Sequence, residues 1–400
     1  MSAEMSVLIE EPRGVDISLI ERELTRLWKD ASEDQEARGA SPVIRACSMN
    51  LVVVTNDESR ASAIGELVGD VSVSHPSRIF LVVLVSHGGE SHLDAWVSAR
   101  CSLPTPGQNQ VCCEEITLTA SGSERKKVSG IVTPLLVPDL PTVVIWKSDA
   151  GLEESGIGAF LPFADRVIID SSELHRPGEV LLSWARFMEA GDDPSSRMNV
   201  VRAGSFQEAL FGDLSWTHLT PWRSLLARVF QPVKVRKVLA EISDVLIEFS
   251  SRPSPAHSGL AQAYLLSGWL ADRLGWDDGE PFRELSSGEL RARLHPRSRS
   301  GPVTVRAFSV PPTDPFTGGL ESVTIRGSGD TVVQLQLTEK KDCVRLEREV
   351  NGFSVEEFLR YPVRQDEAVL LARELDILHR EPAYERTMSR LSRLLAEQDQ

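Results

Sequence analysis

The residues best suited to chemistry in this sequence precede an apolar run, Ile79 to Val85. The segment His75-Pro76-Ser77-Arg78 leads into that run. Pro76 would fix an extended backbone, while His75 and Arg78 offer hydrogen-bond donors to a carboxylate or a phosphate. We favour a structural role, the orientation of a strand, and keep ligand binding as the alternative.

The same run is followed by Ser86-His87-Gly88-Gly89. A glycine-bearing loop at the C-terminal end of a strand is a common ligand site in α/β folds. A lone histidine without a carboxylate or nucleophile partner makes no catalytic constellation, so a flexible turn is the favoured interpretation. A ligand loop formed by His87, Gly88 and Gly89 remains the alternative.

Two carboxylates, Asp165 and Asp170, bracket a second apolar run and could suggest acid–base catalysis. In a strand their spacing places them about 16 Å apart, whereas the carboxylates of glycosidase pairs are separated by roughly 5 to 9.5 Å. They more plausibly orient the two ends of the strand. The sequence motifs for dinucleotide, phosphate, zinc and acyl chemistry are also absent in the right context. We therefore expect no catalytic residue, no cofactor and no metal, and hence no enzyme.

The sequence contains five cysteines: Cys47, Cys101, Cys112, Cys113 and Cys343. They lack the CxxC spacing of zinc sites and are too few for a disulfide framework. Most lie in strand-like apolar contexts, where a free cysteine behaves as a small buried hydrophobe. We expect free thiols in a reducing, cytoplasmic compartment.

The segment from Gly212 to Arg223 places two tryptophans and a helix start within twelve residues. Thr220 suits an N-cap and Pro221 the first helical position, and apolar residues then recur at helical spacing. Trp216 lies ahead of this helix among polar neighbours that include His218, in the pattern of an aromatic anchor with an exposed rim, and core packing is the alternative. For Trp222, which lies within the helix, core packing is the favoured role.

This segment is one of six blocks, between about residue 45 and residue 276, that together resemble the OpcA family of glucose-6-phosphate dehydrogenase assembly proteins. The other five are Asn50-Leu51-Val52-Val53-Val54, His75-Pro76-Ser77-Arg78, Pro138-Asp139-Leu140-Pro141, Ala164-Asp165-Arg166-Val167-Ile168-Ile169-Asp170-Ser171 and Gly268-Trp269-Leu270-Ala271-Asp272-Arg273-Leu274-Gly275-Trp276. The resemblance implies a protein that binds and activates or assembles the first enzyme of the oxidative pentose phosphate pathway.

Composition limits the possible partners. The chain of 400 residues has 41% hydrophobic and 25% charged residues, which is typical of a globular protein with a substantial core. Its net charge of −15 disfavours nucleic acid and anionic lipid as partners. The longest apolar run is far shorter than the roughly 20 residues of a membrane helix, and the acidic N-terminus lacks a signal-peptide start. We therefore expect no membrane partner.

The pattern of apolar runs predicts an α/β fold, α+β in part, with two domains that each contain a mixed sheet with flanking helices. Residues 1–40 form a helical appendage, residues 41–192 an N-terminal α/β domain, and residues 193–400 a C-terminal α/β domain with helices and a β-meander. The boundary rests on the polar, helix-breaking segment 191–196. Residues 277–301, which are acidic and then arginine-rich, are predicted to form an exposed connection.

The functional hypothesis is a non-catalytic assembly factor or allosteric activator whose partner is glucose-6-phosphate dehydrogenase. The candidate partner-binding residues are Trp216, His218, Thr220, Trp222, Arg223, His75 and Arg78. The alternative is a regulatory module in which His75, Arg78 and His87 bind a sugar phosphate or a nucleotide.

Overall fold

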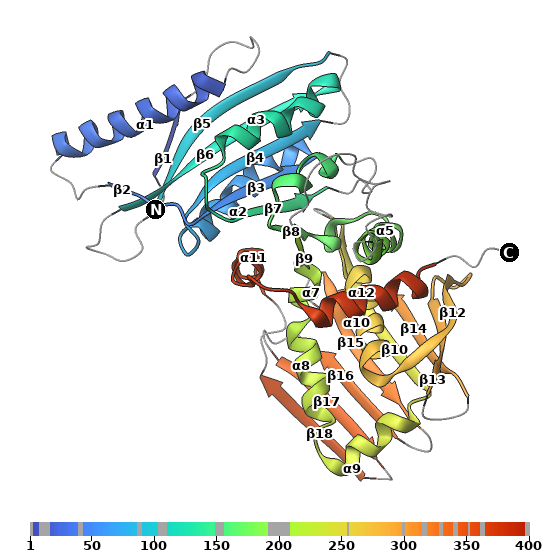
Figure 1. Cartoon of the computed structure of the whole chain (residues 1–400). Helices are drawn as coiled ribbons and strands as arrows, with labels where there is room; N and C mark the ends of the chain where they lie inside the picture. Colours follow the sequence, from blue (N-terminus) through green and yellow to red (C-terminus); the bar gives the residue numbers. More distant parts are fainter. Residues whose placement is uncertain are drawn as a thin grey trace. The chain divides into compact units, whose positions relative to one another are not determined.

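The computed structural model (Figure 1) describes most of the chain. The described residues are 3–7, 17–38, 43–85, 90–102, 110–148, 156–190, 209–253, 256–297, 301–313, 318–327, 331–338, 343–350, 353–360 and 365–396. They belong to two compact units. Unit 1 contains Met1–Ile169, Ala203–Gly212 and Asp366–Arg380, and unit 2 contains Asp170–Arg202, Asp213–Gln365 and Glu381–Gln400.

Unit 1 is built around a nine-stranded sheet in the order β1-β5-β6-β4-β3-β7-β8-β9, with β2 paired to β6. The strands are β1 (Ala3–Val7), β2 (Val43–Arg45), β3 (Met49–Thr55), β4 (Ser77–Val85), β5 (Leu93–Ser102), β6 (Gln110–Ser121), β7 (Thr142–Lys147), β8 (Arg166–Ile169) and β9 (Leu210–Asp213). The neighbours among β6, β4, β3, β7 and β8 pair in parallel, while β5 pairs with β6 in antiparallel fashion. The predicted mixed sheet is confirmed.

The five central parallel strands, counted in chain order, have the spatial order 3-2-1-4-5, which is that of dinucleotide-binding domains. Their near-continuous apolar composition explains this position, because parallel strands are covered on both faces. Every residue of β3 and β7 is buried.

Among the described residues, unit 1 contains helices α1 (Ile17–Arg38), α2 (Ala61–Ser72), α3 (Val128–Leu135) and α11 (Glu367–Leu375), together with short 3₁₀ turns. Helix α1 is not an appendage. Its residues Ile20, Leu24 and Leu27 are buried against the unit, and α1 packs on β5 and α3. Helix α11 comes from far along the chain and packs on α2.

Unit 2 contains a second nine-stranded sheet, ordered β12-β13-β14-β10-β15-β16-β17-β18, with β11 paired to β10. The strands are β10 (Asp244–Pro253), β11 (Ala256–Ser258), β12 (Trp276–Glu284), β13 (Leu290–Pro296), β14 (Val303–Ser309), β15 (Gly319–Arg326), β16 (Val332–Leu337), β17 (Cys343–Val350) and β18 (Phe353–Arg360). The pairing of β10 with β14 is parallel and its pairing with β15 is antiparallel, so this sheet is mixed as predicted. The predicted meander is formed by β15 to β18, whereas β14 lies on the other side of β10.

The expectation of an exposed connection at residues 277–301 was wrong. Most of it forms β12 and β13, which pair with each other. Two of the arginines that suggested a loop, Arg291 and Arg293, lie on one face of β13: Ala292 and Leu294 are buried, while Arg293 between them is exposed. Alternation of buried and exposed residues is the pattern of a strand with one solvated face.

The helices of unit 2 are α5 (Pro177–Ala190), α7 (Leu214–His218), α8 (Thr220–Val229), α9 (Val233–Arg236), α10 (Gly259–Leu274) and α12 (Pro382–Leu394). Helix α10 is buried along most of its length and packs on β10, β14 and β15. Gly268 permits the close approach of α12, because a Cβ there would lie 3.0 Å from the carbonyl oxygen of Thr387.

The predicted fold class is confirmed by these two α/β units. The predicted boundary near residue 192 lies outside the described residues. Contacts group α5 with unit 2, where it packs on α10 and α12, and group α11 with unit 1. Within the described part of the chain, no helix has the length and apolar character needed to cross a membrane.

Candidate functional site

The turn after β3 is the position at which dinucleotide-binding folds hold a pyrophosphate, using glycines that let the backbone come close. Here the turn contains Asn56 and Asp57 and then a 3₁₀ helix, Glu58–Arg60, with no glycine. The Asp57 carboxylate accepts the backbone N–H of Ser59 at 3.0 Å. Asp57 and Glu58 also place negative charge where a phosphate would bind. The turn therefore lacks the means to bind a pyrophosphate in this way.

Arg78 belongs to a charge cluster around the buried Glu114 in unit 1. Its Nε donates to Oε2 of Glu114 at 2.7 Å, and its Nη1 donates to the carbonyl oxygen of Leu135 at 2.7 Å. Glu114, in β6, is only 4% exposed and also accepts hydrogen bonds from Trp28 Nε1 at 2.6 Å and from Arg45 Nη2 at 2.7 Å. Arg78 is thus committed to an internal partner.

A hollow of about 540 Å³ opens beside this cluster. It is lined by Glu21, Leu24, Thr25, Trp28, Arg45, Arg78 and Glu114. Two carboxylates face two guanidinium groups, so their formal charges cancel and the hollow does not favour an anion. The adjacent glutamates Glu114 and Glu115 inside strand β6 were the sequence signal that could have revealed this cluster.

His75 contacts Asp376, the residue that follows helix α11. Its Nε2 is 3.1 Å from Oδ1 of Asp376, and its Nδ1 is 2.9 Å from the hydroxyl of Ser74. His75 and Arg78, which the sequence suggested as joint ligand-binding residues, contact different partners: Asp376 in one case and Glu114 in the other. The loop with His87, Gly88 and Gly89 lies outside the described residues.

Helix α11 is joined to the sheet of unit 1 by further charge pairs. Lys147, at the end of β7, is 1% exposed and pairs with Glu367. Arg166, at the start of β8, pairs with Glu374, and both are buried. Gly212 leaves room for this second pair, because a Cβ there would lie 2.7 Å from Nη2 of Arg166.

Trp216 is fully buried, which corrects the expectation of an exposed rim. Its Nε1 donates to Glu381 at 3.1 Å, its ring lies 5.6 Å from that of Tyr384, and the Arg223 guanidinium sits 3.3 Å from the ring centre. The neighbouring Asp213, Ser215 and Thr217 are buried as well. The sequence misled because polar side chains at these positions are buried within unit 2 rather than exposed to solvent.

The remaining candidates of this segment also have internal contacts. Trp222 is 2% exposed, as core packing predicted. The ring nitrogen Nδ1 of His218 lies 2.9 Å from the Gln262 amide nitrogen, and Arg223 donates to the hydroxyl of Thr220 at 2.8 Å. Thr220 is the first residue of α8, not its N-cap, which is Leu219. Of the five candidates in unit 2, only Thr220 is exposed.

Asp213 is a buried carboxyl that holds two segments of unit 2 together. Its Oδ1 accepts the backbone N–H of Ser215 at 2.8 Å and that of Ser171 at 3.3 Å. Burial raises the pKa of Asp213 to about 7, against the effect of these hydrogen bonds.

The two carboxylates considered for catalysis, Asp165 and Asp170, have the predicted structural roles. Oδ2 of Asp165 accepts the backbone N–H of Thr142 at 2.7 Å, at the start of the strand. Asp170 accepts the N–H and hydroxyl of Ser172 at the other end.

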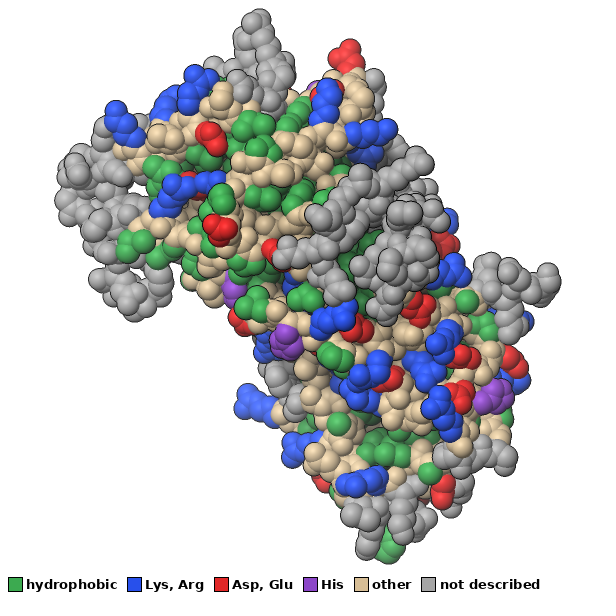
Figure 2. Space-filling model, viewed as in Figure 1, with side chains coloured by type: hydrophobic (Ala, Val, Ile, Leu, Met, Phe, Trp, Pro, Cys, Tyr) green, Lys and Arg blue, Asp and Glu red, His purple; other side chains and the backbone are tan. Residues whose placement is uncertain are grey.

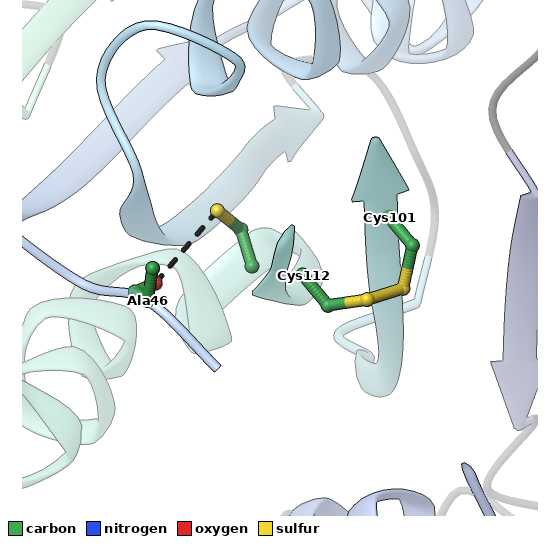
Figure 3. Close-up of a disulfide and its surroundings, with 4 residues drawn as sticks. Ala46, Cys101 and Cys112 are labelled. Atoms are coloured by element: carbon green, nitrogen blue, oxygen red, sulfur yellow. Dashed lines mark hydrogen bonds between the residues drawn. A yellow bond between two sulfur atoms is a disulfide. The ribbon is translucent and has the colours of Figure 1, made fainter. Parts of the chain in front are cut away.

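The expectation of five free thiols was wrong for two of them. Cys101 and Cys112 are directly opposite each other on β5 and β6 and form a disulfide (Figure 3). The two cysteines are too far apart in sequence to form a recognisable motif, and the strand register alone brings them together. Cys113 is buried and donates to the carbonyl oxygen of Ala46 at 3.8 Å, and burial raises the pKa of its thiol, as it does for Cys47.

The fold and this turn together define a class: a two-unit α/β protein with the strand order of dinucleotide-binding domains but without their phosphate-binding glycines. Residues 68–186 match the domain described as glucose-6-phosphate dehydrogenase subunit N-terminal domain, and residues 209–388 match the corresponding C-terminal domain. The chain belongs to the OpcA family, as the sequence blocks indicated.

Similar proteins carry the name OxPP cycle protein OpcA. The protein from Synechocystis sp. is 30% identical over 207 residues, which are 52% of this chain and 38% of the relative. The protein from Synechococcus elongatus is 26% identical over 342 residues, 84% of this chain and 71% of the relative. The match to the first relative thus spans well under half of that relative's length.

Among solved structures, KijD10, a 3-ketoreductase from Actinomadura kijaniata, aligns with a TM-score of 0.45 and 12% identity over 87% of this chain and 96% of its own. An aldose-aldose oxidoreductase from Caulobacter crescentus aligns with a TM-score of 0.42 and 11% identity over 86% and 94%. At this distance no activity is transferred from these enzymes.

Proposed function

We propose that this chain binds glucose-6-phosphate dehydrogenase and shifts its oligomeric or conformational state, without catalysing a reaction itself. The observation that carries the proposal is the match of both units to domains described as parts of a glucose-6-phosphate dehydrogenase subunit. The cytoplasm, where a protein of central metabolism would meet this enzyme, is the proposed compartment.

The turn after β3 supports a non-catalytic role. It has no glycine and contains Asp57 and Glu58, so the chain has little means of holding the dinucleotide that a dehydrogenase needs. Unit 1 would then use this fold to bind the partner enzyme rather than a dinucleotide.

The proposed mechanism is thermodynamic linkage. A protein that binds one state of an enzyme better than another shifts the enzyme toward that state by the difference in binding free energy. A difference of about 1 to 3 kcal/mol changes the ratio of the states by roughly 5- to 150-fold. No chemical step by the bound protein is required.

We place the proposed contact at the start of α8, around Thr220, with His218 and Arg223 beside it. Trp216 and Trp222 would support this surface from below because both are buried. The face of unit 2 seen in Figure 2 carries interspersed positive and negative side chains. Such a polar surface is compatible with a reversible complex.

The alternative of a sugar-phosphate sensor receives less support from the geometry. Arg78 is held by Glu114 and the carbonyl oxygen of Leu135, and the adjoining hollow has balanced charge. An incoming phosphate would have to displace Glu114, a buried carboxylate, from its arginine partners.

The primary experiment mixes the protein with glucose-6-phosphate dehydrogenase from the same organism and measures NADPH formation together with the mass of the complex by light scattering. A heavier species with changed KM or kcat supports the proposal. No complex and an unchanged rate, across substrate and redox conditions, would refute it.

The variant Thr220→Glu tests the location of the contact. A carboxylate in the first turn of a helix is favourable to the helix, so folding should be preserved while the contact gains a charge. Ser62→Glu is a matched control, since Ser62 is exposed in the first turn of α2. We expect at least tenfold weaker binding for Thr220→Glu alone, and equal binding by both variants would place the contact elsewhere. His75→Ala in the same assay tests the candidate residue in unit 1.

A further inference from the structure

Strand β18 is a sheet edge whose side chains are exposed on both faces. Among the described residues it pairs with β17 on one side only. Phe353 is 80% exposed, Phe358 65% and Val355 36%. Proteins usually protect such an edge against pairing with another strand by means of proline or charged side chains, especially lysine. Between Phe353 and Arg360 there is no proline or lysine, and the charged residues are Glu356, Glu357 and Arg360.

The charges at this edge are unevenly matched. Arg345 of β17 pairs with Glu356 of β18 at 2.6 Å and with Glu347 of β17 at 3.3 Å. Glu347 and Glu356 are directly opposite each other, so two carboxylates share one guanidinium. Arg360, two positions beyond Phe358 on the same face of β18, is exposed and forms no ion pair with the described residues. Glu347 and Glu356 therefore have only one cation between them, while Arg360 has no carboxylate partner among the described residues.

We propose that β18 pairs with β18 of a second copy of this chain in antiparallel register, centred on Phe358. Opposite residues of such a pair share a face of the sheet, so residues at equal distances from the centre meet. Glu356 then faces Arg360 of the partner subunit, and Arg360 faces Glu356 of the partner subunit. Phe358 faces the partner subunit's Phe358, which removes two exposed aromatic rings from water.

This register makes the edge complementary to itself, as a two-fold symmetric interface requires. The two carboxylates that share Arg345 gain a second cation, and opposite charges across a strand pair are stabilising where like charges are not. Shifting the centre to Glu357 places the two copies of Glu357 opposite each other, and shifting it to Glu356 does the same for Glu356. Both shifts are disfavoured by repulsion.

Within the described part of β18, the paired segment covers residues 356–360, so the interface is small and we expect a weak dimer with a Kd on the order of 10 µM. Sedimentation velocity should therefore show a weight-average mass that rises from 44.1 kDa toward twice that value as the concentration increases. A mass that stays at the monomer value up to about 100 µM would overturn the proposal.

Charge exchange tests the register. Glu356→Arg places arginine opposite Arg360 of the partner subunit. Arg360→Glu places glutamate opposite Glu356 of the partner subunit. Because each variant sets like charges against each other, the Kd of the dimer should rise at least tenfold for either one. Arg360→Glu is the cleaner variant because Arg360 has no ion pair to lose within the described residues. The double variant Glu356→Arg, Arg360→Glu restores both opposite-charge pairs and should restore the dimer.

Leu378→Glu is the matched control, because Leu378 is 71% exposed but lies outside unit 2. It should associate as the wild type does, and circular dichroism should show that every variant is folded. A double variant that stays monomeric, or single variants that remain dimeric, would overturn this register. If the wild type is monomeric while Phe358→Glu abolishes binding of glucose-6-phosphate dehydrogenase, the edge belongs to the enzyme and the proposed dimer is refuted.

Discussion

Trp216 illustrates how a residue that resembles an interface anchor can instead be part of a core. Glu381, Tyr384 and Arg223 surround its ring within unit 2, and each is polar or amphipathic. A tryptophan can be buried among such groups because its N–H finds an acceptor and its face accepts a cation. The polar residues next to Trp216 in the sequence were therefore no sign of exposure, since Asp213, Ser215 and Thr217 are buried with it.

Trp216→Ala should destabilise the protein by about 3 to 5 kcal/mol, because it removes a buried ring and leaves Glu381 and Arg223 without this partner. Urea unfolding measures the loss. Leu378→Ala, at a 71% exposed position, should stay within about 0.5 kcal/mol of the wild type. Equal midpoints for Trp216→Ala and the wild type would show that the ring is not buried in solution.

Asp213 should make stability depend on pH in an unusual direction. Burial raises the pKa of Asp213 from 3.8 to about 7, so the folded state binds a proton more tightly than the unfolded state. The contribution to stability is then greatest when the carboxyl is protonated and decreases as the pH rises from about 4 to about 7.

The variant Asp213→Asn cannot titrate but keeps an oxygen that can accept the N–H groups of Ser171 and Ser215. Between about pH 5 and pH 8 the wild type should lose about 2 to 3 kcal/mol more free energy of unfolding than this variant. Chemical denaturation at both pH values checks the difference. Parallel pH profiles of the two proteins would contradict the raised pKa.

At the scale of elements, the buried strands of unit 1 could be predicted from their sequence because they are continuous apolar runs. The strands β12 and β13 could not, since the arginines of their solvated face gave the composition of a loop. Strand β18 was missed for a related reason. Its side chains are almost all exposed, so its sequence does not show the alternation of apolar and polar residues that marks a strand with one buried face.

The contacts of α11 were equally hidden. The sequence predicts a helix there, but Glu374 lies 208 residues from Arg166, and no local pattern links them. No local sequence pattern links Cys101 to Cys112 either, or Glu114 to Arg45 and Arg78. Of the candidate site residues, the burial of Trp222 was predictable from helical periodicity, whereas the burial of Trp216 depended on residues near the C-terminus.

The Arg166–Glu374 pair should dominate the attachment of α11 to unit 1. Glu374→Ala leaves a buried guanidinium without its counter-ion and should cost about 3 to 5 kcal/mol. Hydrogen exchange should show loss of protection in α11. The double replacement Arg166→Met, Glu374→Leu removes both charges and should recover most of the stability, whereas equal losses in the single and double variants would mean that the ion pair is unimportant.

For the whole molecule, the retained strand order and the altered turn predict a protein that cannot use the dinucleotide itself. The isolated protein should form no NADPH from glucose 6-phosphate, and millimolar NADP⁺ should not raise its Tm. Carboxylates at Asp57 and Glu58 repel phosphate, and the backbone there has no glycine to approach it. Saturable stabilisation by NADP⁺ would contradict this and reopen the question of catalysis.

The route of the chain through the two units has a consequence for its synthesis. The sheet of unit 1 is complete once β9 has been made, but α11, which packs on α2 and pairs with Arg166, follows only after all the strands of unit 2. A nascent chain must therefore carry an unfinished first unit, with Arg166 still lacking its counter-ion, until the strands of unit 2 have been made. Domains usually fold in order as they emerge from the ribosome. In this protein both units should reach their final stability together, and a fragment that ends before residue 366 should be unstable in both.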